Sequence, residues 1–213
     1  VRRHPSGSSG GTGAGMAADF AAVGIGGDTG GSVRGPAAAG SLVGLRPTTA
    51  LVSRHGSVPF KPSFDAVGPI TRSVKDAALI MDVIAGYDPA DALTAYAVGR
   101  MPSSFATSFS DHALAGARVG VVRQPMQRET NAELSEYRQS RAVFERGVEA
   151  LRRLGASMVE VALPDVAART RSAYEENLFE TEAAVGEFLS RHTNAPIKTL
   201  KALVITPGAL LPW

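Results

Sequence analysis

Residues 26–34 read GGDTGGSVR, and this glycine-rich stretch is the strongest structural signal in the sequence. It follows Val23-Gly24-Ile25, which we interpret as a short buried strand. The glycines before Ser32 permit a positive φ and therefore a tight turn. We expect a short helix to begin at Ser32, where free backbone N–H groups and the helix dipole favour negative charge. The stretch thus predicts a strand, a turn and a helix that present Ser32 beside backbone donors.

A second glycine loop with serines, SGSSGG, occupies residues 6–11. Glycines around a serine leave room for a substrate and leave N–H groups free to bind an oxyanion, and losing one such donor costs about 3 to 4 kcal/mol in hydrolases that use them. The loop also matches Gly-x-Ser-x-Gly, but a nucleophile elbow requires a hydrophobic strand before it, and residues 1–5 are not one. The dinucleotide-binding fingerprint fails in the other loop, because position 29 is Thr.

Either loop alone is typical of an ordinary turn, but both belong to a longer ordered series of motifs. This series resembles the signature of the amidase-signature family and covers about residues 5–123. Its segments are Gly7–Gly11, Gly26–Ala37, Gly44–Thr48, Val52–Gly56, Asp65–Val74, Asp76–Ala78 and, more weakly, Gly86–Asp91.

The resemblance implies a triad of a serine, a second serine beside a cis peptide bond, and a lysine. By motif position Ser32 is the nucleophile, and Ser8, expected to precede the cis bond, relays the proton to the leaving amine. A serine hydroxyl needs such an adjacent base because it is a weak nucleophile at its free pKa. The remaining implied residues are the oxyanion-hole amides of Thr29, Gly30, Gly31 and Ser32, and the loop supports Ser9, Asp28 and Arg34.

The implied catalytic lysine is expected before residue 1. The lysines present are all downstream of both serines: Lys61, Lys75, Lys198 and Lys201. We interpret Lys61, in a proline-rich loop, and Lys75, in a first helical turn, as solvated surface charges. Both ends of the chain look cut, so we expect a partial domain and no activity from residues 1–213 alone.

Composition narrows the remaining classes of function. The chain has 213 residues, a net charge of +2, no cysteine and scattered basic residues. This charge pattern is weak evidence for a nucleic-acid partner, and we expect none unless the protein is an amidotransferase subunit. No apolar run approaches the roughly 20 residues that span a bilayer. No histidines are spaced as metal ligands usually are; the four in the chain are His4, His55, His112 and His192. We expect no bound metal, no organic cofactor and no membrane association. The absence of cysteine leaves the cellular compartment open, and we expect a cytoplasmic location.

Alternating strands and helices predict an α/β fold with a mixed, mostly parallel sheet flanked by helices, the incomplete amidase-signature fold. The expected helices are 13–22, 73–86, 130–154 and most of 166–191, and the expected strands are 23–25, 42–45, 117–122 and 157–161. Residues 51–72 and 88–110 are expected to be loops. We divide the partial domain 1–213 into a signature core, 5–123, and a peripheral α/β segment, 124–213.

The expected function is hydrolysis of a carbon–nitrogen amide bond through an acyl-enzyme on Ser32, acting on a small-molecule amide. An alternative is the glutaminase subunit of a tRNA-dependent amidotransferase, which would need partner subunits. A third is a catalytically silent, truncated homologue that serves as a binding or structural domain. A homodimer is one expected assembly.

Overall fold

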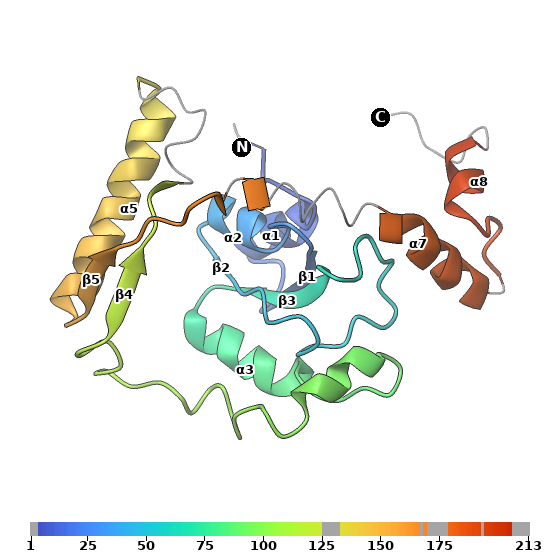
Figure 1. Ribbon diagram of the computed structural model, residues 1–213, viewed down its shortest axis with the longest axis horizontal. Coiled ribbons are helices and arrows are strands. Elements are labelled where there is room, and N and C mark those ends of the chain that lie inside the picture. Colours follow the sequence, from blue (N-terminus) through green and yellow to red (C-terminus); the bar gives the residue numbers. More distant parts are fainter. Residues whose placement is uncertain (1–3, 125–132, 167, 170–178, 193, 206–213) are drawn as a thin grey trace. The chain divides into compact units, whose positions relative to one another are not determined.

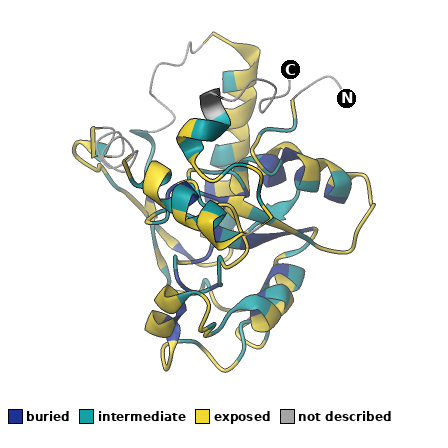
Figure 2. Ribbon diagram, turned by 90° about the vertical axis from the view of Figure 1, so that its right-hand side faces the viewer, coloured by how far each residue is buried: buried dark blue, intermediate teal, exposed yellow. Residues whose placement is uncertain are grey.

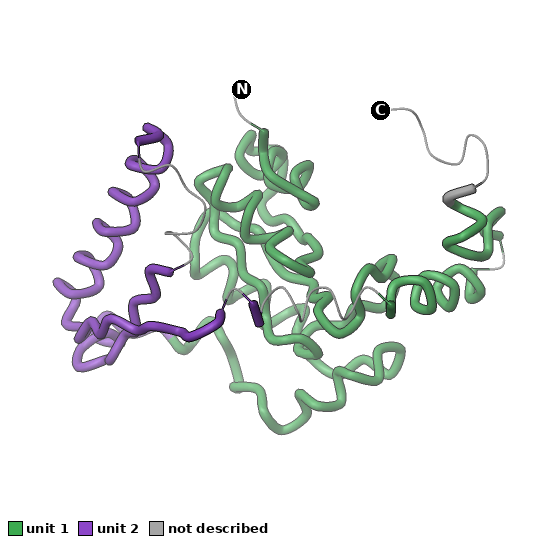
Figure 3. Tube along the Cα trace, turned by 45° about the horizontal axis from the view of Figure 1, so that its top comes forward, with its two compact units in different colours: residues 1–108, 176–213 green, residues 109–175 purple. Residues whose placement is uncertain are grey.

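The computed structural model describes residues 4–124, 133–166, 168–169, 179–192 and 194–205. The chain forms two compact units, residues 1–108 with 176–213 and residues 109–175 (Figure 3). Among the described residues, no helix has both the length and the apolar character that crossing a bilayer requires. The division expected from sequence, at residue 123, stays a prediction.

The elements follow one another along the chain as labelled in Figure 1. They are α1 (Gly10–Ala17), β1 (Gly24–Asp28), α2 (Arg34–Ala39), β2 (Val43–Gly44), β3 (Ala66–Thr71), α3 (Val74–Ile84), the 3₁₀ helix η1 (Ala92–Ala97), β4 (Arg118–Val121), α5 (Ser135–Arg153), β5 (Ser157–Glu160), α7 (Glu180–Arg191) and α8 (Leu200–Ile205).

The first unit is built on a three-stranded sheet with β3 in the centre, between β1 and β2. Both pairings are antiparallel, with Gly24 opposite Ile70 and Asp28 opposite Ala66 at the two ends of the β1–β3 ladder. Helices α1 and α2 contact this sheet, and the core between them consists of Met16, Val33, Ala37 and Ile70, with Leu42 packed against it. Figure 2 marks buried residues in dark blue.

Small residues let the backbones of this unit approach closely. A Cβ on Gly68, in β3, would lie 2.0 Å from the carbonyl oxygen of Leu45, and one on Gly13, in α1, would lie 2.8 Å from the Pro36 ring. Real side chains cannot occupy such positions without moving the backbone. Close packing therefore requires glycine at Gly13 and Gly68.

The second unit contains β4, α5 and β5. Strands β4 and β5 are parallel, and α5 is the crossover between them, as the sequence predicts for a strand–helix–strand series. Helix α5 ends at Arg153, and Gly155 follows with φ of +96°. The expected helix started at residue 130, and residues 130–132 lie outside the described residues.

The α/β class is confirmed, but neither described sheet is mixed: the three-stranded sheet is antiparallel and the two-stranded sheet is parallel. The prediction of mostly parallel strands was wrong for β1, β2 and β3, which are all joined by antiparallel ladders. The reason is that α2 is not a crossover between parallel neighbours: it leads into the two-residue strand β2, and the chain then returns through β3.

Residues 51–72, expected to be rich in loops, contain strand β3, which the sequence interpretation did not place. Pro69 normally argues against a central strand, since it has no N–H to donate. Here the Pro69 carbonyl accepts from Leu45 N at 3.0 Å, so its nitrogen faces the side where the β2 ladder has ended. A hydrogen-bonded antiparallel pair would also have residue 69 N donate to the Leu45 carbonyl, so Pro69 costs the sheet this one bond, just past the last paired residue of β2.

The other expected elements differ from the structure mainly in their boundaries. Helix α1 begins and ends earlier than the expected 13–22, and η1 lies within the expected loop 88–110. Ser73 caps α3 as predicted: its Oγ accepts from Asp76 N at 3.0 Å. Helix α7 matches the end of the expected 166–191, of which residues 167 and 170–178 lie outside the described residues.

We predict that Gly68→Ala lowers the free energy of unfolding by about 1–3 kcal/mol or more, because the new methyl group meets backbone atoms that cannot yield. Gly15→Ala is the matched control, since nothing lies within 4 Å of its Cβ position and alanine favours the helix by up to about 1 kcal/mol. Urea denaturation measures both. Equal midpoints for the two variants would contradict the packing argument.

Candidate active site

The first serine loop joins the second through Ser9, at the start of α1. The Ser9 N–H donates to the Ser32 carbonyl at 3.2 Å, and its hydroxyl donates to the Gly27 carbonyl at 3.2 Å. Gly26 allows this approach, because a Cβ there would lie 2.5 Å from the Ser9 hydroxyl. The structure thus brings the residue after Ser8 into contact with the main chain of Ser32.

A cis peptide bond joins Gly7 to Ser8. The sequence interpretation placed this bond after Ser8, and that detail was wrong: the bond precedes the serine. Ser8 is exposed and lines a pocket. The Ser8 hydroxyl is therefore accessible from the side on which a substrate can bind.

The turn that carries Ser32 is folded around the buried carboxylate of Asp28, which is 1% exposed. Its Oδ1 accepts from Gly31 N at 2.7 Å, and its Oδ2 accepts from Val33 N at 3.1 Å and from Arg34 N at 3.3 Å. Arg34 adds two side-chain hydrogen bonds of 3.0 Å, and Arg46 Nε lies 3.5 Å from Oδ1. Asp28 and Arg34 therefore form an ion pair that fixes the turn.

These contacts change the acidity of Asp28. Burial raises the pKa of this carboxyl, but hydrogen bonds from the Arg34 side chain and from the amides of Gly31, Val33 and Arg34 outweigh it and lower the pKa to about 2. Asp28 is thus ionised at any pH at which the protein is expected to work. Its negative charge is a structural component of the turn.

The backbone amides of the turn divide into two groups. The Gly31 amide donates to Asp28, so the expectation that it is an oxyanion donor does not hold in this structure. Its role here is to brace the turn, because a buried carboxylate must be satisfied by nearby donors. Within the part of the chain that the structure describes, the amides of Thr29, Gly30 and Ser32 donate to no other protein group.

A pocket of about 570 Å³ lies beside these loops. One side of it is formed by Ser8, Asp28 and Thr29, and Ser32 is not among the described residues that line it. The other walls are the loop 54–60 and the end of α7, where Glu187, Phe188, Arg191 and His192 line the pocket. The pocket therefore adjoins one serine and the turn that carries the other.

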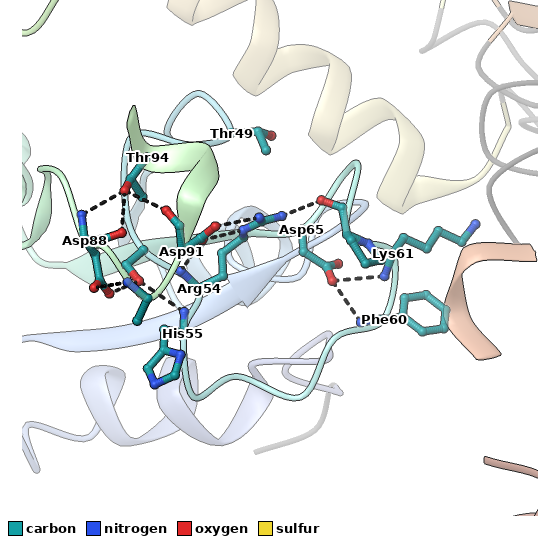
Figure 4. Close-up of polar contacts among 12 residues, drawn as sticks. Thr49, Arg54, His55, Phe60, Lys61, Asp65, Asp88, Asp91 and Thr94 are labelled. Carbon is teal, nitrogen blue, oxygen red and sulfur yellow. Dashed lines mark hydrogen bonds and ion pairs between the residues drawn. The ribbon is translucent and has the colours of Figure 1, made fainter. Parts of the chain in front are cut away.

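Hydrogen bonds hold the pocket loop at both ends (Figure 4). Arg54 donates to both carboxylate oxygens of Asp91 and to the Pro62 carbonyl, and Asp65 accepts from the amides of Phe60 and Lys61. Helix α7 is attached to the same loop, with the Ser63 hydroxyl donating to Glu180 at 2.5 Å and the Thr181 hydroxyl donating to the Phe60 carbonyl at 2.7 Å.

Sequence reasoning assigned no role to Asp65, Arg46, Arg54 or α7. Arg46, Arg54 and Asp65 lie in stretches that carry the family resemblance. The motifs thus mark these residues, but the sequence does not show which groups they contact. His55 does line the pocket, and its amide donates to the Ser53 hydroxyl at 3.1 Å.

The interpretation of Lys61 as a solvated charge was wrong, because this residue is 0% exposed. Its ammonium nitrogen lies 5.7 Å from the centroid of the Phe60 ring. An ammonium group that is buried in this way must be paired or hydrogen-bonded. Lys61 is not among the described residues that line the pocket, whereas Lys75 is exposed as expected.

Comparison with known proteins gives a match to the family model described as Amidase over residues 1–206. The chain belongs to the amidase family. The peptide amidase of Stenotrophomonas maltophilia superposes with a TM-score of 0.82 and 37% sequence identity, covering 94% of this chain and 39% of that protein. A peptide amidase bound to the competitive inhibitor chymostatin gives a TM-score of 0.84 at 37% identity and the same coverage. The amidase-signature fold expected from sequence is confirmed.

Curated relatives include a second kind of amidase-family protein, a subunit of glutamyl-tRNA(Gln) amidotransferase. The one from Deinococcus deserti is 42% identical over 166 residues, which are 78% of this chain and 32% of that relative. The corresponding protein of Gloeobacter violaceus is 44% identical over 162 residues, 76% of this chain and 31% of that relative. The chain spans about a third of the length of these curated relatives.

We predict that the charge on Asp28 contributes about 2 kcal/mol to the free energy of unfolding, from the lowering of its pKa to about 2. Because the folded pKa lies below the unfolded value, this contribution is present above about pH 4 and is lost as the pH falls towards about 2.

Urea denaturation of wild type and Asp28→Asn between about pH 2 and pH 7 measures this contribution. The difference between the two proteins should be largest at neutral pH and should shrink as the acid form of Asp28 is populated. A difference that is independent of pH would contradict the role of the charge.

Proposed function

We propose that the complete protein hydrolyses a carbon–nitrogen amide bond through an acyl-enzyme on Ser32. The observation that carries this proposal is the contact of Ser9 with Ser32 and Gly27, which joins the two serine loops of the amidase family next to one pocket. The match to the family over residues 1–206 supports the reaction class. No cofactor is part of the proposal, and a cytoplasmic location and a homodimer remain predictions.

In this mechanism the Ser32 hydroxyl oxygen bonds to the amide carbonyl carbon, and the carbonyl oxygen becomes an oxyanion. The amides of Thr29, Gly30 and Ser32 are the proposed donors to that oxyanion, since none of them donates to another described group. Ser8 takes up the Ser32 proton and delivers it to the amine nitrogen as the carbon–nitrogen bond breaks. Water then hydrolyses the ester on Ser32.

The family resemblance assigns the base that accepts the proton from Ser8 to a lysine upstream of the first loop. The position of this lysine stays a prediction. A lysine can act as a base when a closed pocket removes water from it and favours its neutral form. The roles of Ser9, Asp28, Gly31 and Arg34 in the proposal are to hold the loops.

A second candidate is the glutaminase subunit of a tRNA-dependent amidotransferase. The 42% identity to a glutamyl-tRNA(Gln) amidotransferase subunit favours it, and the similarity to peptide amidases favours a stand-alone enzyme. For the amidotransferase subunit the substrate is the side-chain amide of glutamine, and other subunits are required. For the stand-alone amidase the substrate is a free small-molecule or peptide amide.

We predict that a fluorophosphonate probe labels Ser32 in the complete protein, because attack on phosphorus displaces fluoride and uses the same nucleophile and donors. Ser32→Ala should abolish labelling, and Ser8→Ala should slow it by at least about 100-fold, since the proton relay is lost. Mass spectrometry of the labelled peptide identifies the site. Ser57→Ala, a serine of the pocket loop, is the matched control and should still be labelled at Ser32.

Labelling that survives Ser32→Ala would refute the assignment of the nucleophile. A complete wild-type protein that is not labelled at all would refute the proposed hydrolase and favour the catalytically silent homologue.

Ammonia release distinguishes the two enzymatic candidates. A stand-alone amidase should release ammonia from a dipeptide amide without any partner. An amidotransferase component should release it from glutamine only when the other subunits are added. Release from both substrates without partners would exclude the obligate-complex candidate.

A further inference from the structure

The register of the sheet places Asp65 opposite Thr29. Strand β1 ends at Asp28, which pairs with Ala66, the first residue of β3. In an antiparallel ladder the next residues outward face each other, and these are Thr29 and Asp65. The pairing of the two strands therefore brings a carboxylate to the first residue of the turn that presents the oxyanion donors.

The Asp65 carboxylate binds three donors at this point. Its Oδ1 accepts from the Thr29 hydroxyl. Its Oδ2 accepts from Phe60 N at 2.8 Å and from Lys61 N at 2.9 Å (Figure 4). A charged acceptor forms stronger hydrogen bonds than a neutral one. One side chain thus holds both the donor turn and the wall of the pocket formed by residues 54–60.

A neighbouring contact fixes the peptide group of Thr29. Arg46 Nε donates to the Asp28 carbonyl at 3.3 Å, and its Nη2 donates to the Phe64 carbonyl at 2.6 Å. The Asp28 carbonyl and the Thr29 N–H belong to one planar trans peptide group, so they point in opposite directions. Holding the carbonyl on Arg46 and the Thr29 side chain on Asp65 leaves the N–H of Thr29 with one orientation.

We propose that Asp65 is a positioning residue that acts through Thr29 to hold the Thr29 amide where the oxyanion develops. This inference deepens the proposed hydrolysis and rests on it. Asp65 itself lines the pocket, and its proposed role is to supply the fixed geometry on which a preformed oxyanion hole depends. Donors that must reorient during the reaction stabilise the transition state less.

The test measures the rate at which a fluorophosphonate probe labels Ser32 in the complete protein. Measuring this rate over a range of probe concentrations gives two quantities, the maximal rate and the probe concentration at which the rate is half-maximal. Asp65→Ala should lower the maximal rate about 10- to 100-fold, with a smaller change in the half-maximal concentration, because the lost interaction acts mainly in the transition state. Thr29→Val removes only the hydroxyl link and should lower the maximal rate about 10-fold. The double variant should be within about 3-fold of Asp65→Ala, because both changes break one link.

Asp82→Ala is the matched control. The Asp82 carboxylate also accepts from one hydroxyl and two amides, those of Ser104, Phe105 and Ala106, and it does not line the pocket. It should lower the urea midpoint of unfolding by an amount similar to Asp65→Ala and leave the labelling rate unchanged. This comparison separates positioning from a general loss of stability.

Each outcome decides the inference. An Asp65→Ala rate equal to that of Asp82→Ala, or effects of Thr29→Val and Asp65→Ala that multiply, would overturn the positioning role while leaving the proposed hydrolysis intact. Absence of labelling in the wild type would overturn the proposed function and the positioning role together.

Discussion

The structure around the candidate site depends on a buried negative charge. Asp28 lies at the end of β1 with 1% of its surface exposed, and an unpaired carboxylate in that position would be prohibitively unfavourable. The chain can satisfy it only by turning back at once, so that the amides of Gly31, Val33 and Arg34 and the Arg34 guanidinium all reach the same two oxygens. The position of Ser32 follows from this turn.

Close packing extends this constraint to the first serine loop. Gly26 leaves space for Ser9, whose two hydrogen bonds connect α1 with the turn at Ser32, and Gly68 leaves space for the carbonyl of Leu45 beside the sheet. The site is therefore assembled from main chain more than from side chains. Larger residues at these positions would push the packed segments apart, because interiors of this density do not absorb an added methyl group.

Much of this arrangement could be predicted from sequence where the signal is local. The capping pair Ser73 and Asp76, the strand–helix–strand unit after residue 117 and the serine-bearing turn all depend on neighbouring residues. The errors concern longer distances. Strand β3 contains Pro69, whose lost donor falls just past the last paired residue of β2. The burial of Lys61 depends on the surface around it, which its proline-rich local sequence does not specify. Nothing local to Gly31 shows that its amide is committed to Asp28.

The central claim is that the two serine hydroxyls and the free amides of the turn converge on one reacting group. A high-resolution crystal structure of the complete protein after reaction with a phosphonate tests it most directly. We predict phosphorus bonded to Ser32 Oγ, a phosphonyl oxygen within hydrogen-bond distance of the Thr29 and Gly30 amides, and the Ser8 hydroxyl beside Ser32 Oγ. A phosphonyl oxygen directed away from these amides, or a Ser8 hydroxyl out of hydrogen-bond reach of Ser32, would contradict it.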